Sequence, residues 1–432
     1  MGSRLRIPLR PVVVAARGKG LRKLARRTWV IASRYGVSPQ RMEKRLAALQ
    51  AIAEEYRCRA TLPVTAATAR RNADVIRRYS ALGMEFAVHG YYHVDHRHLS
   101  AAQQWQQVGR ARDELEALGV RVTGFRAPYL RANDATMQAL RHNGFSYDSS
   151  QAFHWPIDEP IQVEAYTRGL EFCSALSAID YPVLPWSEDG LVRIPCSLPD
   201  DEAIVDRLHL SPQENQQLWV SILDASAQRG ELFTLALHPE RIESCRSAIV
   251  GVLEAAAKSS PPIWLARLDE IATWWREKSH TSVKVREHGS GMLRVSIRGP
   301  DGVTVLGRGV EVPGERWADG YVRIREADFL VRATRRPFVG VHPSSAPSLI
   351  TFLQEQGYII EMADSPHDHT YFLQRERFLR EDQRDLVTEL EAGRFPLLRL
   401  GRWPQGTRSA LSITGDVDAL TIWDYASRFL GR

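Results

Sequence analysis

The chain has 432 residues, of which 44% are apolar and 25% charged, and its formal net charge is +6. The length suggests two or three domains, and the composition is typical of a globular protein, because Pro and Gly are not enriched enough for a disordered chain. The sequence has no run of about 18 apolar residues, so we expect no membrane-spanning helix. The cysteines (Cys58, Cys173, Cys196 and Cys245) are scattered without a CxxC pair, which argues against a zinc ribbon and a dense disulfide framework. Cys173 and Cys196 have apolar neighbours, so we expect them to be buried free thiols, and we expect a reducing compartment.

Residues 1–34 carry ten Lys and Arg and no Asp or Glu. Such an arm is either a solvated basic tail or a segment that lies on an anionic membrane surface. Its apolar run, residues 11–16, is short for a signal peptide, whose core is about 7–15 residues long. We therefore expect a cytoplasmic protein, with peripheral membrane contact through residues 1–34 as an option. No nucleic acid is expected as a partner, because no recognised motif accompanies the positive charge.

Residues 36–150 show local patterns that predict alternating helices and strands. Met42, Leu46, Leu49 and Ile52 form one apolar stripe, which predicts an amphipathic helix over 39–57. The segments that follow are predicted in chain order as strand 60–66, helix 72–83, strand 85–90, helix 101–119, strand 122–129 and helix 134–144. This alternation predicts a parallel sheet or a βα barrel.

Residues 151–190 are irregular and aromatic, which predicts loops over an active-site face. Alternation then resumes with strand 191–198, helix 212–229, strand 232–239, helix 244–258, strand 263–268 and a helix near 268–277. Near residue 280 the pattern changes to period-two alternation with Gly-rich turns, which predicts a small antiparallel module. We divide the chain into a basic arm (1–35), a βα barrel (36–280), a β-rich module (281–340), an α/β connector (341–400) and a C-terminal strand and helix (401–432).

Two histidines, His89 and His93, follow the predicted strand 85–90 in the segment HGYYHVDH. Imidazoles four residues apart at the end of a strand can converge on one ion, and neutral imidazole suits Zn, Co, Ni or Fe. An HxxxH pair also occurs by chance. The neighbouring His96 and His98 are equally consistent with a solvated histidine-rich loop.

The segment GFRAPYLR places Arg126, Pro128 and Tyr129 at the end of another predicted strand. Proline stiffens the turn, arginine can hold a carboxylate, and a backbone N–H can face an oxyanion. The alternative is a structural turn with an exposed salt bridge.

Two further segments end predicted strands in polar residues. LFTLALHP delivers His238, which is a candidate general acid or else a structural histidine. SITGDVDAL delivers Asp416 and Asp418, which can reach into one cleft or else lie in a solvated loop.

Together these segments resemble the polysaccharide deacetylases, the family 4 carbohydrate esterases with a NodB homology domain. The matching motifs are the HxxxH pair, Arg126-Ala127-Pro128-Tyr129, and the segment ending in His238, in which Ala236 stands where the family usually has leucine. YDSS (147–150) and IPCSLPDD (194–201) also look like segments of this family. The resemblance covers residues 36–275 and implies a distorted (β/α) barrel.

The sequence departs from the family at its beginning. Members begin with an Asp-bearing strand, whereas residues 1–38 contain no Asp or Glu. The segment SALSITGDVDALTIWDY near the other end looks like that first strand. We infer a circular permutation, in which the last strand inserts beside strand 60–66 and completes the barrel; the alternative is that the two aspartates belong to a separate domain.

The resemblance implies a metal-dependent hydrolase that removes N-acetyl groups from amino sugars of a polysaccharide or a glycan precursor. The implied metal is divalent, with zinc expected first and cobalt or nickel as alternatives. Its implied ligands are Asp418, His89 and His93, although the two aspartates could exchange roles. The implied catalytic residues are Asp416 as base, Arg126 as the residue that orients it, Tyr129 through its backbone N–H, and His238 as acid.

Two other functions stay open. One is hydrolysis of a non-sugar C–N bond, as in a cyclic amide or a formamide, since relatives of this fold accommodate that chemistry. The other is carbohydrate binding by a protein with a decayed site.

Overall fold

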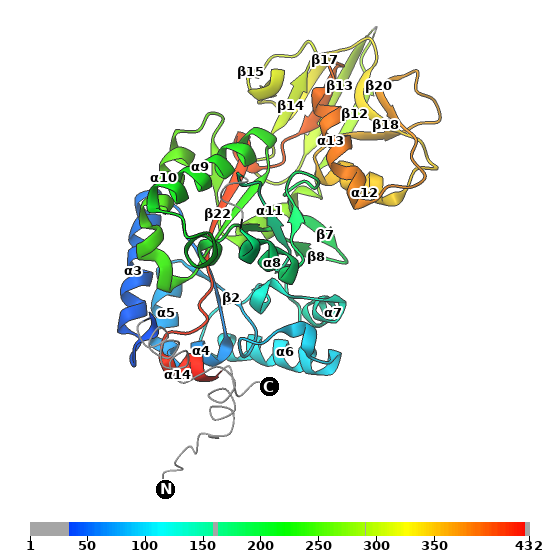
Figure 1. Cartoon of the computed structure of the whole chain (residues 1–432). Coiled ribbons are helices and arrows are strands. Elements are labelled where there is room, and N and C mark those ends of the chain that lie inside the picture. The colour runs from blue at the N-terminus through cyan, green and yellow to red at the C-terminus, as the bar shows by residue number, and fades with distance from the viewer. Residues whose placement is uncertain (1–33, 159–162, 290, 428–432) are drawn as a thin grey trace.

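The computed structural model describes residues 34–158, 163–289 and 291–427. The predicted basic arm therefore lies almost wholly outside the described residues. Figure 1 shows a helix-covered barrel region below and a smaller β-rich region above, joined by β22, which descends from the upper region into the barrel. Among the described helices, none is both long and apolar enough to cross a membrane.

One curled, mixed sheet forms the barrel region, in the order β6-β5-β9-β10-β22-β1-β2-β3-β4-β8-β7, with β11 also paired to β22. Its strands are β1 (Thr61–Val64), β2 (Glu85–Val88), β3 (Gly124–Phe125), β4 (Tyr147–Asp148), β5 (Ala152–His154), β6 (Leu176–Ser177), β7 (Trp186–Glu188), β8 (Leu191–Arg193), β9 (Cys196–Leu198), β10 (Leu232–Leu237), β11 (Ile263–Leu265) and β22 (Ser409–Gly415). All of these pairs are parallel except β7 with β8.

The sheet curls because the chain of two strands continues past a short break, from β4 into β5 and from β8 into β9. Strand β8 pairs with β4, and its continuation β9 pairs with β5 and with β10. The two halves of the sheet are thus joined along β4–β5 and β8–β9, which gives a distorted barrel. This confirms the predicted fold class.

The C-terminal strand β22 lies between β1 and β10. All seven of its residues are buried, as expected for a central parallel strand of small and apolar side chains. Its insertion beside β1 is the arrangement that the sequence predicted. Circular permutation, as the origin of that arrangement, stays a prediction.

Helices cover the outside of the sheet. They are α3 (Gln40–Glu55), α4 (Ala66–Arg71), α5 (Ala73–Ala81), α6 (Ala101–Ala117), α7 (Asp134–His142), α8 (Glu164–Cys173), α9 (Pro212–Arg229), α10 (Ile242–Lys258), α11 (Leu268–Lys278) and α14 (Ile422–Ser427). The predicted stripe of α3 is buried in the main core. The prediction of loops over 151–190 was wrong in part, because α8 and three short strands lie there.

The upper region contains three small sheets and two helices. Its sheets have the orders β12-β13-β17, β15-β16-β14-β21 and β19-β18-β20. The elements are β12 (Ser282–Glu287), β13 (Met292–Arg298), β14 (Val305–Arg308), β15 (Glu315–Arg316), β16 (Tyr321–Ile324), β17 (Asp328–Arg332), β18 (Arg336–Val341), β19 (Ile360–Met362), β20 (His369–Leu373), β21 (Leu397–Leu400), α12 (Pro347–Glu355) and α13 (Gln383–Ala392). Burial alternates along β13 and β17, which is the period-two pattern of strands with one buried face.

Tryptophans fill much of the core where the two regions meet. Trp275 and Trp403 are fully buried with ring centroids 5.7 Å apart, and Trp403 donates a hydrogen bond to the Gly230 carbonyl at 3.0 Å. Trp274 donates to the Arg402 carbonyl at 2.9 Å. All four cysteines are free and buried.

Candidate active site

Strand register brings distant segments to one end of the barrel. The N–H of His89 donates to Val64 O at 2.9 Å, and the N–H of Val417 donates to Pro63 O at 2.7 Å, so both segments continue alongside β1. Their side chains meet there: His89 Nε2 and His93 Nε2 each lie 3.4 Å from Asp418 Oδ1. The three residues are buried, and their ligand atoms lie within 4.8 Å of one another.

The donor set of this group suits a divalent transition metal. Two imidazole nitrogens and one carboxylate oxygen are the three-ligand pattern that leaves further coordination positions open. His89 Nδ1 lies 2.8 Å from the backbone carbonyl of Arg126, to which it can only donate. That hydrogen bond fixes the tautomer and leaves the Nε2 lone pair directed at Asp418. The residues present therefore fit the predicted metal.

Asp416 is held differently from Asp418. Its Oδ1 accepts a hydrogen bond from Arg126 Nη1 at 2.8 Å, whereas its Oδ2 lies 4.0 Å from His89 Nε2. Arg126 is fully buried and is itself fixed by hydrogen bonds to Thr414 Oγ1 at 2.9 Å and to Ser149 O and Oγ at 3.1 and 3.0 Å. The geometry separates the two aspartates, since only Asp418 belongs to the compact ligand group.

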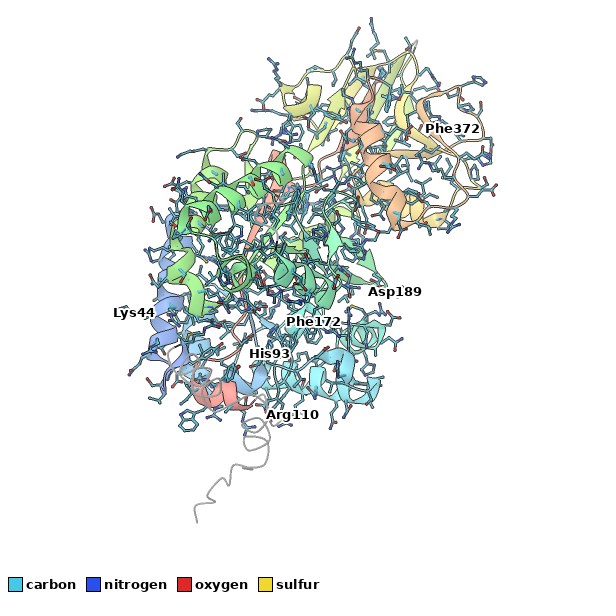
Figure 2. All side chains as sticks on the ribbon, in the orientation of Figure 1. Lys44, His93, Arg110, Phe172, Asp189 and Phe372 are labelled. Carbon is cyan, nitrogen blue, oxygen red and sulfur yellow. The ribbon has the colours of Figure 1, made fainter. Side chains whose placement is uncertain are left out.

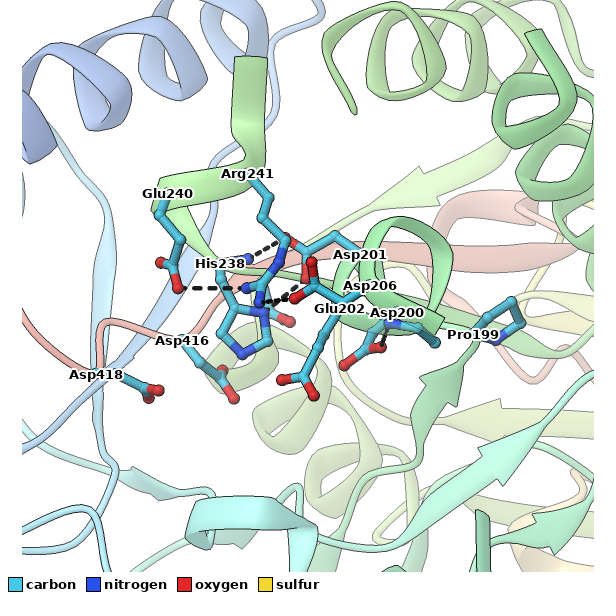
Figure 3. A network of polar contacts seen from close by, with 12 residues as sticks. Pro199, Asp200, Asp201, Glu202, Asp206, His238, Glu240, Arg241, Asp416 and Asp418 are labelled. Carbon is cyan, nitrogen blue, oxygen red and sulfur yellow. Dashed lines mark hydrogen bonds and ion pairs between the residues drawn. The ribbon is translucent and has the colours of Figure 1, made fainter. Parts of the chain in front are cut away.

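His238 lies on the other side of Asp416. The register pairs Leu237 of β10 with Gly415 of β22, so the two polar residues that follow are neighbours. His238 Nδ1 contacts Asp201 Oδ1 at 2.6 Å, and Figure 3 shows the ring pointing towards the part of the pocket where the Asp416 carboxylate lies. Burial lowers the pKa of His238, but the charge and hydrogen bond of Asp201 outweigh it and raise that pKa well above 6.5.

Sequence reasoning did not single out Asp201. It lies within IPCSLPDD, a segment that resembles part of the polysaccharide deacetylases. No nearby residue indicates that its partner is His238, 37 residues away. For His96, the alternative prediction of a solvated histidine-rich loop was wrong. It is fully buried against Phe125, and burial lowers its pKa to about 4, so it is not part of a solvated loop. His98 is exposed.

Tyr129 stands at the mouth of the site. Its φ of 61° places it in the left-handed region, which a tyrosine adopts only where the surroundings impose it. Its ring packs edge-on against the His93 ring, with centroids 4.4 Å apart.

These residues line one pocket of about 150 Å³. His89, His93, Asp416, Asp418 and His238 form its floor, together with Tyr129 at the rim. Residues of α8 and the acidic residues Asp200 and Glu202 also line it. Arg126 reaches the floor through Asp416. Every predicted site residue thus lies in this pocket or contacts a residue that does.

Comparisons with known proteins found a matching family model, a similar sequence and similar solved structures. A family model for polysaccharide deacetylases matches residues 30–147. A peptidoglycan deacetylase-like protein of Gibberella zeae is 26% identical over 210 residues, and the match covers 44% of this chain and 62% of that protein.

Two solved structures are also similar. A probable polysaccharide deacetylase from Pseudomonas aeruginosa PAO1 is 21% identical with a TM-score of 0.44, and the match covers 58% of this chain and 75% of that chain. The structure of PuuE allantoinase is 20% identical, also with a TM-score of 0.44, and the match covers 54% of this chain and 72% of that chain.

Proposed function

Because the chain is homologous to the polysaccharide deacetylases, we propose that it is a metal-dependent hydrolase that removes N-acetyl groups from amino sugars of a polysaccharide or glycan precursor. The observation that carries the proposal is the convergence of His89, His93 and Asp418 beside Asp416 and His238 in one pocket. Such a set combines ligands with a separate base and acid, which hydrolysis of an amide requires.

His89, His93 and Asp418 would hold the metal. A bound divalent cation, zinc first and cobalt or nickel otherwise, supplies a Lewis acid that polarises a carbonyl oxygen and eases deprotonation of water. Asp416 is the proposed base. Arg126 occupies its Oδ1, which leaves Oδ2 to take a proton from the attacking water.

His238 is the proposed acid. Asp201 holds its Nδ1 and keeps the ring protonated at neutral pH, so Nε2 can donate a proton to the departing amine. We assign the backbone N–H of Tyr129 to the oxyanion of the tetrahedral intermediate, because Tyr129 borders the ligand group.

A carbohydrate-binding protein with a decayed site is disfavoured, since the three candidate ligands, the candidate base and the candidate acid all line one pocket. We also propose a cytoplasmic location, with membrane contact through residues 1–34.

The test combines metal content with acetate release. Wild type, Asp418→Ala and Asp416→Asn are stripped with a chelator, reloaded with zinc and assayed on N-acetylglucosamine oligomers. We expect Asp418→Ala to lose metal and activity, and Asp416→Asn to keep metal while activity falls at least about a hundredfold. Asp74→Asn, an exposed control on α5, should match wild type.

Equal metal content in wild type and Asp418→Ala would contradict the ligand assignment. Hydrolysis of a cyclic amide or a formamide, with no acetate released from the sugars, would replace the proposed function by its alternative.

A further inference from the structure

Two large aromatic side chains are exposed side by side at the mouth of the pocket. Tyr129 is 44% exposed and Phe172 is 49% exposed, and their rings meet edge-on with centroids 6.1 Å apart. Both line the pocket. Isolated exposed apolar residues are common on protein surfaces, but adjacent aromatics beside a polar pocket are typical of binding surfaces.

Phe172 is held firmly although half of it faces solvent. The Arg131 guanidinium lies over its ring at 4.3 Å, and Arg131 Nη1 donates to the Phe172 carbonyl. Arg131 is in turn paired through Nε with Asp95 Oδ2 at 2.7 Å. A ring fixed before binding loses little conformational entropy when a ligand covers it.

The aromatic pair is continuous with the ligand group. The Tyr129 ring contacts the His93 ring, so Phe172 lies one aromatic ring farther from the reaction centre (Figure 2 labels His93 and Phe172 in the same part of the barrel). A substrate whose acetyl group reaches the ligand group would therefore place its next unit at Phe172.

The lining of the same pocket also offers hydrogen-bond acceptors. Asp200 and Glu202 line the same pocket, and Figure 3 shows their carboxylates on the side of His238 away from Asp418. Burial, together with the charges of Glu202 and Asp201, raises the pKa of Asp200 to about 6, so it still accepts hydrogen bonds at neutral pH. Exposed aromatic rings and carboxylates lining one pocket match a sugar ring, which has an apolar C–H face and a rim of hydroxyl donors.

We propose that Phe172 is a specificity-determining residue, which stacks against the sugar ring next to the N-acetylated one and makes the protein act on oligomers in preference to a single sugar. This inference rests on the proposed function and names its substrate class.

The experiment measures how activity depends on substrate length. Zinc-loaded protein is assayed for acetate release from N-acetylglucosamine monomer and tetramer. Phe172→Ala should lower kcat/KM for the tetramer about tenfold, which is the worth of one good aromatic contact, and leave the monomer within about twofold. Phe172→Trp should restore the preference. Trp105→Ala removes a comparably exposed aromatic, 51% exposed on α6 and remote from the pocket lining, and should have no effect.

A Phe172→Ala variant that keeps the wild-type tetramer-to-monomer ratio overturns the inference, whether both rates fall or neither does. If wild type releases no acetate, calorimetric titration with the tetramer tests the stacking role of Phe172 separately from the proposed function. Binding that Phe172→Ala weakens would support the stacking surface while the proposed function fails. Equal binding by both proteins, or binding by neither, would overturn the inference as well.

Discussion

His238 can carry a proton at neutral pH because of one neighbour. Its environment is buried, which by itself would favour the neutral imidazole. The Asp201 carboxylate at 2.6 Å reverses that preference and raises the pKa of His238. The pair therefore stabilises the fold most below the ordinary histidine pKa of 6.5, and its contribution is lost as pH rises through the raised value.

Asp201→Asn is expected to lower the pKa of His238, because burial then acts without the opposing charge. The alkaline limb of the kcat/KM profile, where the acid loses its proton, should move to lower pH. A profile measured between pH 5 and 10 checks this, with Asp206→Asn on the neighbouring Arg241 as the control. An unmoved limb would mean that His238 is not the acid.

Glu85 shows the opposite balance at the start of β2. Burial and the charge of Asp269 raise its pKa to about 8, despite hydrogen bonds from Thr61 and Tyr147 at 2.6 Å each. The folded chain therefore keeps a proton that the unfolded chain releases above its ordinary value of 4.5. Because the unfolded state binds fewer protons, stability falls as pH rises from 4.5 towards 8.

Glu85→Gln cannot ionise, so its free energy of unfolding should depend less on pH across that range. Urea unfolding at pH 5.5 and pH 8 measures the difference. We expect the wild type to lose more stability than the variant between the two conditions. An equal loss in both proteins would show that Glu85 is ionised in the fold.

At the scale of elements, β22 positions the two aspartates of the candidate site, which follow its last residue. Its pairing with β10 runs over six residues, from Leu232 with Ala410 to Leu237 with Gly415. Beyond the strand, an extended segment continues alongside β1 through the Val64–Val417 bridge. The two aspartates are separated by one residue, and in extended chain this spacing turns both side chains to the same face. A shift of one residue in this pairing would turn them away from the histidines.

Helix α8 supplies part of the pocket lining. Tyr166 and Cys173 are buried beneath it, whereas Phe172 at its last turn faces solvent. The helix ends at Ser174, whose φ of 55° reverses the chain and whose Oγ accepts from Arg97 at 3.2 Å. The helix is thus tied to the loop that follows the candidate ligands His89 and His93.

At the scale of the molecule, the two ends of the described chain meet. The N–H of Ile422 donates to Gly36 O at 2.9 Å, and the rings of Tyr35 and Tyr425 lie 5.4 Å apart. The barrel region could therefore be closed by a short linker between these ends, while the long connection through the upper region is removed.

A rewired chain tests this: residues 403–427, a short Gly-Ser linker, then residues 34–280. We expect it to be soluble and to bind metal in the wild-type ratio, because β22 regains both neighbours. Its melting temperature should fall, since Trp274 and Trp275 lose part of their cover. Circular dichroism and elemental analysis measure both properties, with residues 34–280 alone as the control, which should not fold. A rewired chain that binds no metal would show that the upper region is needed to position the site.

Local sequence patterns predict most of the helices and strands of the barrel region. The stripe of α3 and the βα alternation are local patterns, because periodicity depends on neighbours along the chain. The ligand group is what the resemblance to a known family implies. The resemblance to a known family also predicts that the last strand lies beside strand 60–66, where β22 pairs with β1.

Which side chains meet depends on the three-dimensional fold. The pairing of Asp201 with His238, the separate roles open to Asp416 and Asp418, and the exposure of Phe172 beside Tyr129 depend on strand register and on the path of α8. Contacts between residues far apart in sequence arise when buried strands pair, and no local pattern encodes that pairing.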